Sequence, residues 1–175
     1  MDAESFSFFW KGVLLGVHAG ISPGPVTTLL VTESLLHGRR AGMRIAFVPV
    51  LTDLPVIAMI IPLLYYLMLD ATTMIAIISM VGAFILCGFS CESFSVTASR
   101  YERGDVERVS LLRAVGMNFF NPNLYIYWMT ICGPLAVSGL SCGWSTMFLF
   151  LTTFYVSITL VKLSLSLAVG SVRQR

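Results

Sequence analysis

The sequence is dominated by long apolar stretches in which charged residues are rare. About 20 apolar residues in a helix cross a hydrocarbon core of about 30 Å. Five segments reach that length, at about Phe6–Leu36, Ile45–Leu69, Thr73–Phe94, Leu111–Val137 and Trp144–Gly170. They are continuously apolar, whereas the strands of a membrane β-barrel alternate apolar and polar residues. The sequence therefore predicts an all-α polytopic membrane protein with about five transmembrane helices, in one domain over residues 1–175.

Composition excludes several other classes of protein. Charged residues make up 11% of the 175 residues, against about 25% in soluble domains. The absence of any acidic or basic run argues against nucleic acid as a partner. The cysteines lie in or beside apolar segments, without the spacing of a redox pair or a zinc site, at Cys87, Cys91, Cys132 and Cys142. We interpret them as helix-packing residues and predict no metal and no cofactor.

The positions of the arginines predict how the chain is oriented in the membrane. Cytoplasmic connections carry an excess of Lys and Arg. Arginines occur in the first and third connections and in the tail, at Arg39, Arg40, Arg44, Arg100, Arg103, Arg108, Arg113, Arg173 and Arg175. The connections around Asp70 and at Ser138–Gly143 contain no Lys or Arg. Asp2 and Glu4 precede the first apolar run, where a signal peptide has basic residues, so that run is expected to remain as a membrane helix. We predict an inner or plasma membrane protein with its N-terminus outside and its C-terminus in the cytoplasm.

The first span is interrupted by Pro23, Gly24 and Pro25. The two prolines lack backbone donors and prevent a regular helix, and Gly24 allows unusual dihedral angles. In lipid, the freed carbonyls must be satisfied by protein or by water in a cavity. Broken helices in transporters present backbone groups to the substrate at such points, although a packing kink is the simpler alternative. These three residues are therefore candidates for substrate binding.

The fourth span has its own interruption, at Asn118, Asn121, Pro122 and Asn123. Side-chain amides in an apolar helix are unfavourable unless they find partners. We predict that these four residues also contribute to substrate binding. An aromatic cluster follows, which either lines a pocket, packs between helices or belongs to an interfacial belt: Tyr125, Tyr127 and Trp128.

The two interruptions predict an inverted repeat. Pro122 follows Pro23 by 99 positions, and Trp144 follows Ile45 by the same interval (122 − 23 and 144 − 45). The first and fourth spans run in opposite directions, which requires an odd number of helices in each repeat. We predict repeat 1 at about 6–94, a cytoplasmic linker at 95–110 and repeat 2 at about 111–172. The third helix of repeat 2 would be missing, which gives an incomplete 3+3 inverted repeat with proline-broken helices 1 and 4.

Two ionisable residues lie deep inside predicted spans. Asp53 lies about 13 Å beyond Arg44, and Lys162 about 16 Å before Arg173, on the helical rise per residue. Opposite charges at similar depth either pair or face a wet cavity, and a carboxylate in this position can carry protons. Both are therefore candidates for proton or ion coupling. His18 either titrates near neutral pH or makes a packing hydrogen bond. The spans contain no catalytic pair or metal triad, so an enzyme is not expected.

These features together resemble the LysE/RhtB family of amino-acid exporters. The matching residues are Gly12 and Gly16, Ser22–Pro25, Gly38–Gly42, Asp53 and Asn121–Pro122. The most specific element is the early Pro-Gly-Pro followed by Asn-Pro about 100 residues later. Three departures stand out: Thr52 replaces a common glycine, Asn123 replaces a frequent lysine, and family members usually carry a sixth hydrophobic segment.

The resemblance implies a secondary transporter that exports an amino acid or similar small metabolite across the cytoplasmic membrane, driven by the proton gradient. The substrate would lie between the two broken helices, and Asp53 would couple protons. The expected partners are this solute and the lipid bilayer, and the unfinished repeat favours a homodimer. The alternatives are a truncated or non-transporting membrane subunit, or a related transporter for another small solute or a cation.

Overall fold

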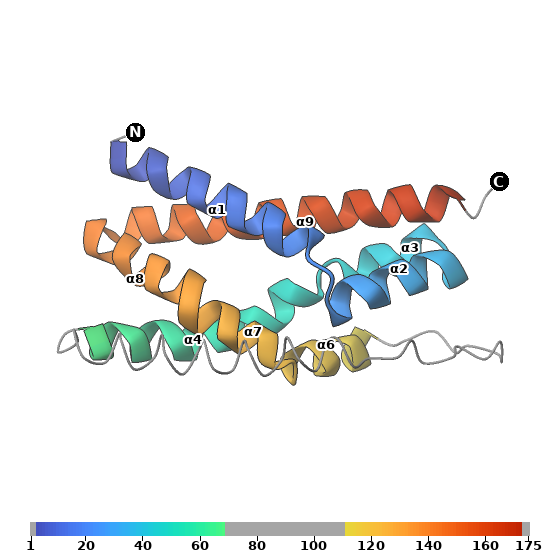
Figure 1. The fold of residues 1–175 in the computed structure, drawn as a ribbon, viewed down its shortest axis with the longest axis horizontal. Helices are drawn as coiled ribbons and strands as arrows, with labels where there is room; N and C mark the ends of the chain where they lie inside the picture. The colour runs from blue at the N-terminus through green and yellow to red at the C-terminus, as the bar shows by residue number, and fades with distance from the viewer. Residues whose placement is uncertain (1–2, 69–110, 173–175) are drawn as a thin grey trace.

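The computed structural model describes residues 3–68 and 111–172, and the secondary structure of this part is helical, with no strand (Figure 1). Its elements are α1 (Ala3–Ile21), α2 (Pro25–His37), α3 (Arg39–Ile45), α4 (Val48–Met68), α6 (Leu111–Phe119), α7 (Pro122–Tyr127), the π-helical turn Trp128–Cys132, α8 (Gly133–Cys142) and α9 (Trp144–Val172). The all-α prediction is confirmed. The predicted third span, Thr73–Phe94, and the predicted linker lie outside the described residues.

The described part contains three helices that are long and apolar enough to cross a membrane. They cover Arg39–Tyr66, Pro122–Cys142 and Trp144–Ser171. A fourth span is reached if α1 and α2, which are bent by 58° at their junction, are counted together. These helices fall at four of the five predicted spans, so the prediction of a polytopic helical membrane protein is confirmed.

The break between α1 and α2 occurs where the sequence places its two prolines. Pro25 is in the first turn of α2, a position where the missing N–H would have no helical partner in any case. On the other side, the Ser22 N–H donates to the His18 carbonyl at 2.9 Å. The Thr27 hydroxyl donates to the Ser22 carbonyl, also at 2.9 Å. The backbone around the break is thus partly satisfied by the protein itself.

The predicted bounds of the fourth span, Leu111–Val137, were wrong. The spanning helix runs over Pro122–Cys142, and α6 is a separate short helix before it. Asn121 is extended and caps α7, its side chain accepting a hydrogen bond from the Asn123 N–H at 3.1 Å. Because Pro122 has no N–H to donate to α6, the helix ends before it. The proline break therefore separates α6 from the long apolar helix Pro122–Cys142.

In both broken regions, a proline lies in the first turn of the helix that follows the break. Pro25 has this position in α2 and Pro122 has it in α7. This likeness supports the inverted repeat. The repeat stays a prediction because the third helix of repeat 1, predicted at Thr73–Phe94, lies outside the described residues.

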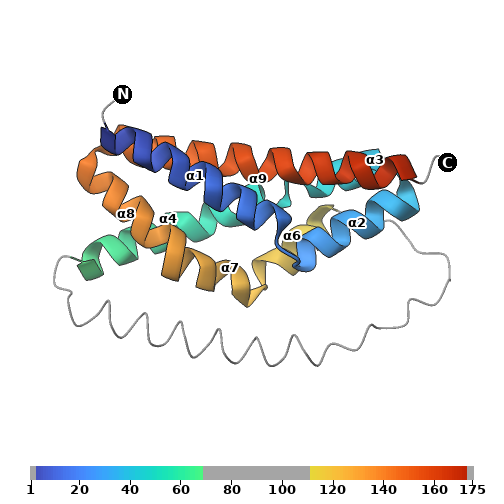
Figure 2. The same cartoon turned by 45° about the horizontal axis from the view of Figure 1, so that its top comes forward.

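Helix α9 runs along the longest dimension of the described part, and α1 lies beside the N-terminal half of α9 (Figures 1 and 2). The contact is made by a buried stripe of Gly12, Gly16 and Gly20 on α1. A Cβ atom at Gly16 would meet the Phe154 carbonyl and would lie 2.8 Å from the Cβ of Ser157. The glycines therefore allow a backbone approach that any side chain would prevent, as in other small-residue contacts between membrane helices.

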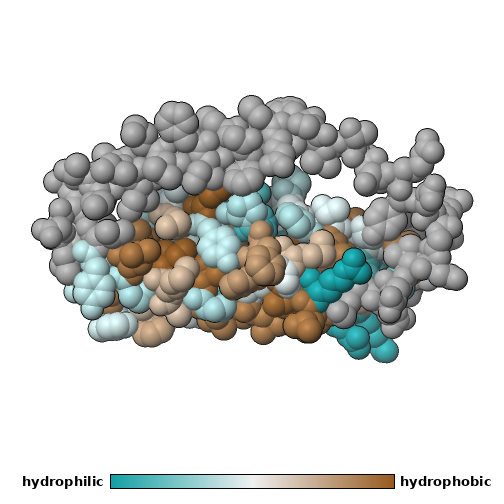
Figure 3. All heavy atoms as spheres, turned by 90° about the horizontal axis from the view of Figure 1, so that it is seen from below, coloured by the Kyte–Doolittle hydropathy of each residue, from teal (hydrophilic) through white to brown (hydrophobic). Residues whose placement is uncertain are grey.

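Helices α8 and α9 are in contact and run in opposite directions from the short turn that joins them (Figure 1). The turn between them contains Gly143, whose φ of 128° is in the region that favours glycine. Large aromatic side chains fill the space beneath, with Trp128, Phe150 and Phe154 almost fully buried. On the face seen in Figure 3, apolar residues cover most of the described surface and the most hydrophilic ones gather near one end. Such a surface suits a lipid environment.

Candidate functional site

A cavity of about 290 Å³ lies where the two helix breaks meet. Eight of the nine predicted site residues line it: Pro23, Gly24, Pro25, Asp53, Asn118, Asn121, Asn123 and Lys162. Pro122 does not line it and instead starts α7. The cavity thus brings together residues from both breaks with the two ionisable residues of the predicted spans.

Asp53 is held on α4 by donors from two helices. The Trp128 Nε1–H donates to its Oδ2 at 3.2 Å, and the Thr52 hydroxyl lies 3.0 Å from its Oδ1. The carboxylate is 4% exposed. The buried hydroxyl of Tyr155, on α9, lies near the same carboxylate and makes no hydrogen bond among the described residues. A buried carboxylate is favourable only with such partners, which also fix its direction toward the cavity.

Thr52 connects the Asp53 helix to the second break. The Asn118 side chain, near the end of α6, donates to the Thr52 Oγ1 at 2.6 Å. The Thr52 hydroxyl has one proton, and its acceptors are the Asp53 carboxylate and the Val48 and Pro49 carbonyls, at 3.0 to 3.2 Å. The amide that was expected to need a partner in an apolar span therefore has one, and a chain of hydrogen bonds runs from α6 to Asp53.

Lys162 reaches the cavity from α9. Its ammonium donates to the Thr27 hydroxyl at 2.9 Å, and Thr27 in turn donates to the Ser22 carbonyl at the first break. Lys162 is only 2% exposed. No ion pair joins it to Asp53 within the part of the chain that the structure describes. Of the two arrangements open from the sequence, direct pairing or two charges facing one cavity, the structure has the second.

The start of a helix faces the cavity at each break. Gly24 and Pro25 begin α2, and Asn121 and Asn123 begin α7, and all four line the cavity. The N-terminus of a helix carries a partial positive charge from its unpaired N–H groups. The cavity therefore offers a carboxylate, an ammonium and two helix N-termini within one small volume.

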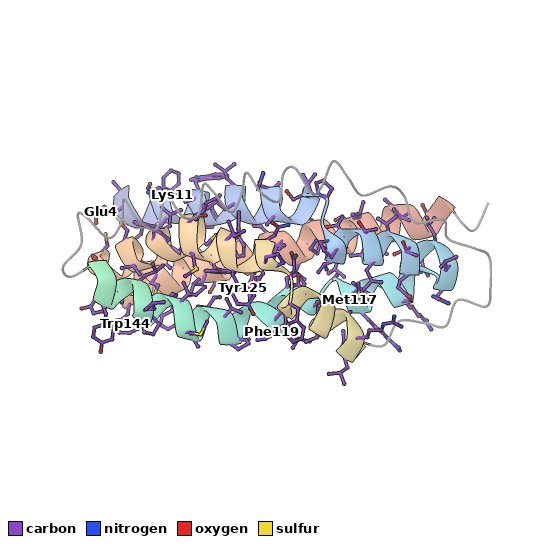
Figure 4. The ribbon with its side chains drawn as sticks, turned by 60° about the horizontal axis from the view of Figure 1, so that its bottom comes forward. Glu4, Lys11, Met117, Phe119, Tyr125 and Trp144 are labelled. Atoms are coloured by element: carbon purple, nitrogen blue, oxygen red, sulfur yellow. The ribbon has the colours of Figure 1, made fainter. Side chains whose placement is uncertain are left out.

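Two of the three aromatic residues after the second break line the cavity, and the third packs outside it. Tyr127 and Trp128 line the cavity, and the Tyr127 hydroxyl donates to the Leu15 carbonyl at 3.2 Å. Tyr125 does not line it, and its ring packs edge-on against Phe119 at 6.2 Å between centroids (Figure 4). His18 also lines the cavity, with its ring stacked on Tyr127 at 6.4 Å.

Thr27, in the cavity wall, and Tyr155, beside the site, were not selected by the sequence reasoning. Thr27 lies in the first turn of α2, where a hydroxyl two residues after Pro25 was a usable signal. Tyr155 precedes Lys162 by seven residues on α9 (162 − 155), which is two helical turns and therefore the same face. A search for polar residues at helical spacing from the known candidates would have found both.

The residues that line the cavity include several groups that can bind a charged solute. Within residues 3–68 and 111–172, no three His, Cys, Asp or Glu side chains are grouped so that they could hold a metal ion. The polar groups that face the cavity are one carboxylate, one ammonium, one imidazole and several amides and hydroxyls. Such groups recognise a charged solute by hydrogen bonds and ion pairs.

Comparison with known proteins identifies the family of the chain. A sequence model of a family described as LysE, LysE type translocator, matches residues 17–175, which include both helix breaks, Asp53 and Lys162. Neither the curated proteins nor the solved structures gave a match. The chain belongs to the LysE type translocator family.

Proposed function

We propose that this protein is a secondary transporter that exports an amino acid or similar small metabolite and couples this export to protons. The observation that carries the proposal is the cavity between the two helix breaks, with Asp53 and Lys162 in its wall. Transporters with broken helices hold their substrates at such a place, near the middle of the membrane.

Family membership sets the general class. LysE type translocators transport amino acids or related small solutes and are not enzymes, and this multi-pass membrane protein is one of them. Pockets for drug-sized ligands have volumes of about 300–1,000 Å³. The cavity here, at about 290 Å³, lies just below that range and suits a solute of amino-acid size.

Asp53 is the group that we assign to proton coupling. It is buried at the cavity wall, and its two oxygens accept hydrogen bonds from the Thr52 hydroxyl and the Trp128 indole. When Asp53 is protonated on the oxygen that faces Thr52, it becomes a donor there, and the Thr52 hydroxyl then donates to a backbone carbonyl instead. Because Thr52 is hydrogen-bonded to Asn118 at the second break, the protonation of Asp53 can change the hydrogen bonding at that break. We propose this chain of bonds as the coupling element.

The orientation and assembly are also part of the proposal. Arg39, Arg40 and Arg44 all lie on one short helix, α3, which connects α2 to α4. Their number supports placing this connection in the cytoplasm of a cell with the N-terminus outside. We also propose that two copies of the protein assemble as a homodimer.

A transport assay in vesicles tests the function. Vesicles that contain the purified protein and labelled amino acids should release them faster when a pH gradient is applied. In Asp53→Asn this dependence on the gradient should be lost. The matched control is Glu4→Gln, since Glu4 is an exposed carboxylate near the start of α1, far along the chain from the cavity residues (Figure 4). If the rate of release does not depend on the pH gradient and is equal in Asp53→Asn and the wild type, the proposal is contradicted. A non-transporting membrane subunit would then be favoured.

A further inference from the structure

The cavity holds two buried charges of opposite sign that do not neutralise each other by contact. Lys162 and Asp53 both line it, and the ammonium nitrogen and the carboxylate oxygens are more than 4.0 Å apart. The ammonium of Lys162 has three N–H donors, and among the described residues it makes one hydrogen bond, to Thr27. A buried charge with unused donors is unfavourable until an acceptor arrives. Each charge therefore needs a partner of opposite sign, and the cavity is where that partner would lie.

The surroundings of Lys162 suit a carboxylate. Thr27 is in the first turn of α2, so the ammonium is anchored beside the N-terminus of a helix. Gly24, which caps α2 without a side-chain hydrogen bond, leaves the first N–H groups of the helix without a side-chain acceptor. A carboxylate at this point would accept bonds from Lys162 and from the helix end together.

The two charged groups of the cavity wall, Lys162 and Asp53, form its two poles. The negative pole, Asp53, lies on α4. Asp53 accepts one hydrogen bond on each carboxylate oxygen, from Thr52 and Trp128. Each carboxylate oxygen can accept a second bond, and a ligand ammonium could supply it. The α-carbon of an amino acid carries an ammonium and a carboxylate side by side, which is the charge pattern that complements these two poles.

We propose that the cavity binds the zwitterionic end of a neutral amino acid, with its carboxylate at Lys162 and Thr27 and its ammonium at Asp53. Lys162 is thus the residue that sets specificity, because it rejects solutes that lack a carboxylate or carry additional positive charge. The remaining wall is largely apolar and accepts an aliphatic side chain, through Leu124, Ile126, Ile131, Phe154 and Ile158. The inference rests on the proposed transport function for its biological meaning, but it concerns recognition and can be measured without transport.

Binding to the purified wild-type protein tests the charge pattern without any mutation. The probes are labelled L-leucine, its amide, which is a cation without a carboxylate, and 4-methylpentanoate, which lacks the ammonium. Leucine should bind at least about 10-fold more tightly than either analogue, since each analogue loses a charge-assisted interaction. L-Lysine should compete more weakly than leucine. Equal affinity for leucine and its amide, or no leucine binding, would overturn the inference.

Two variants then assign the poles. In Lys162→Met, which keeps the length of the apolar stem, leucine should bind about 10- to 100-fold more weakly while the amide is unaffected. In Asp53→Asn the pattern reverses, because leucine weakens and 4-methylpentanoate does not. Lys11→Met is the matched control, since Lys11 lies over the Phe8 ring on α1 and not at the cavity (Figure 4). Leucine affinity in Lys162→Met equal to that of Lys11→Met would refute the role of Lys162.

The two proposals fail in different ways. If vesicle transport is absent but the three probes bind in the expected order, the zwitterion site stands and the transport function falls. If transport depends on the pH gradient but Lys162→Met leaves the order of the probes unchanged, the transport function stands and the zwitterion site falls.

Discussion

Replacing Gly16 with alanine tests whether the contact between α1 and α9 depends on the absence of a side chain. The new Cβ would lie 2.8 Å from the Cβ of Ser157 and would also meet the carbonyl of Phe154. Carbon atoms prefer a separation of about 3.5–4.0 Å. Neither a Cβ nor a backbone carbonyl can move by changing rotamer, so the two helices must shift apart by roughly 1 Å.

The magnitude follows from two opposing effects. Overpacking of a closely packed contact costs about 1–3 kcal/mol, and the rigid neighbours of Gly16 favour the upper half of that range. Alanine is a better helix former than glycine by about 1 kcal/mol. We therefore expect Gly16→Ala to lower the free energy of unfolding by about 1–2 kcal/mol, which is a 5- to 30-fold change in the folded-to-unfolded ratio.

Gly116→Ala is the matched control, because Gly116 also lies inside a helix, α6. Among the described residues, nothing lies within 4 Å of the place where its Cβ would be. Only the propensity effect remains, so this variant should be more stable than the wild type by about 0.5–1 kcal/mol. The two alanine substitutions should therefore change stability in opposite directions.

Unfolding in mixed micelles, with helical content followed by circular dichroism as the share of denaturing detergent rises, measures both variants. Gly16→Ala should unfold at a lower share and Gly116→Ala at a higher share than the wild type. If Gly16→Ala is as stable as Gly116→Ala, the helices do not approach as closely as the structure shows, and the role of the glycine stripe is wrong.

Two further predictions concern the hydrogen bonds at the site and the orientation of the chain. Thr52→Val removes a hydroxyl bonded to two side chains, and at about 0.6 kcal/mol for each bond between membrane side chains it should destabilise by about 1 kcal/mol. Thr130→Val is its control, because the Thr130 hydroxyl bonds to a carbonyl of its own helix, and equal unfolding midpoints in the two variants would contradict the network. In a variant that keeps Cys142 as its single cysteine, a membrane-impermeant maleimide should label intact cells, because this thiol is exposed at the α8–α9 turn. Labelling only after permeabilisation would reverse the proposed orientation.

Much of the candidate site could be predicted because the features that mark it are local. A proline has no N–H wherever it stands, so Pro25 and Pro122 must begin a helical segment or break one. Asp53 and Lys162 stand out because a charge inside an apolar segment is rare. These rules operate on the sequence without knowledge of the neighbours, and eight of the nine residues selected line one cavity in the structure.

The partners of these residues could not be predicted in the same way. Thr52 and Asn118 are 66 positions apart, and Trp128 and Asp53 are 75 apart. Which side chains meet across helices depends on the rotation and spacing of each helix, and both are set by packing. The bounds of the fourth span were wrong for a related reason, since hydropathy alone does not show on which side of a break the spanning helix lies.

The sequence by itself determined that this chain is a bundle of membrane helices, where two of them break, and which charges lie inside. Apolar segment length, missing backbone donors and the energetic penalty of buried charge are all properties of short stretches of chain. Only the tertiary structure decided that Asp53 and Lys162 face one cavity without pairing, and that Thr27 anchors the lysine. That outcome required the glycine stripe of α1 to bring the first break close to α9, a contact between residues more than 130 positions apart.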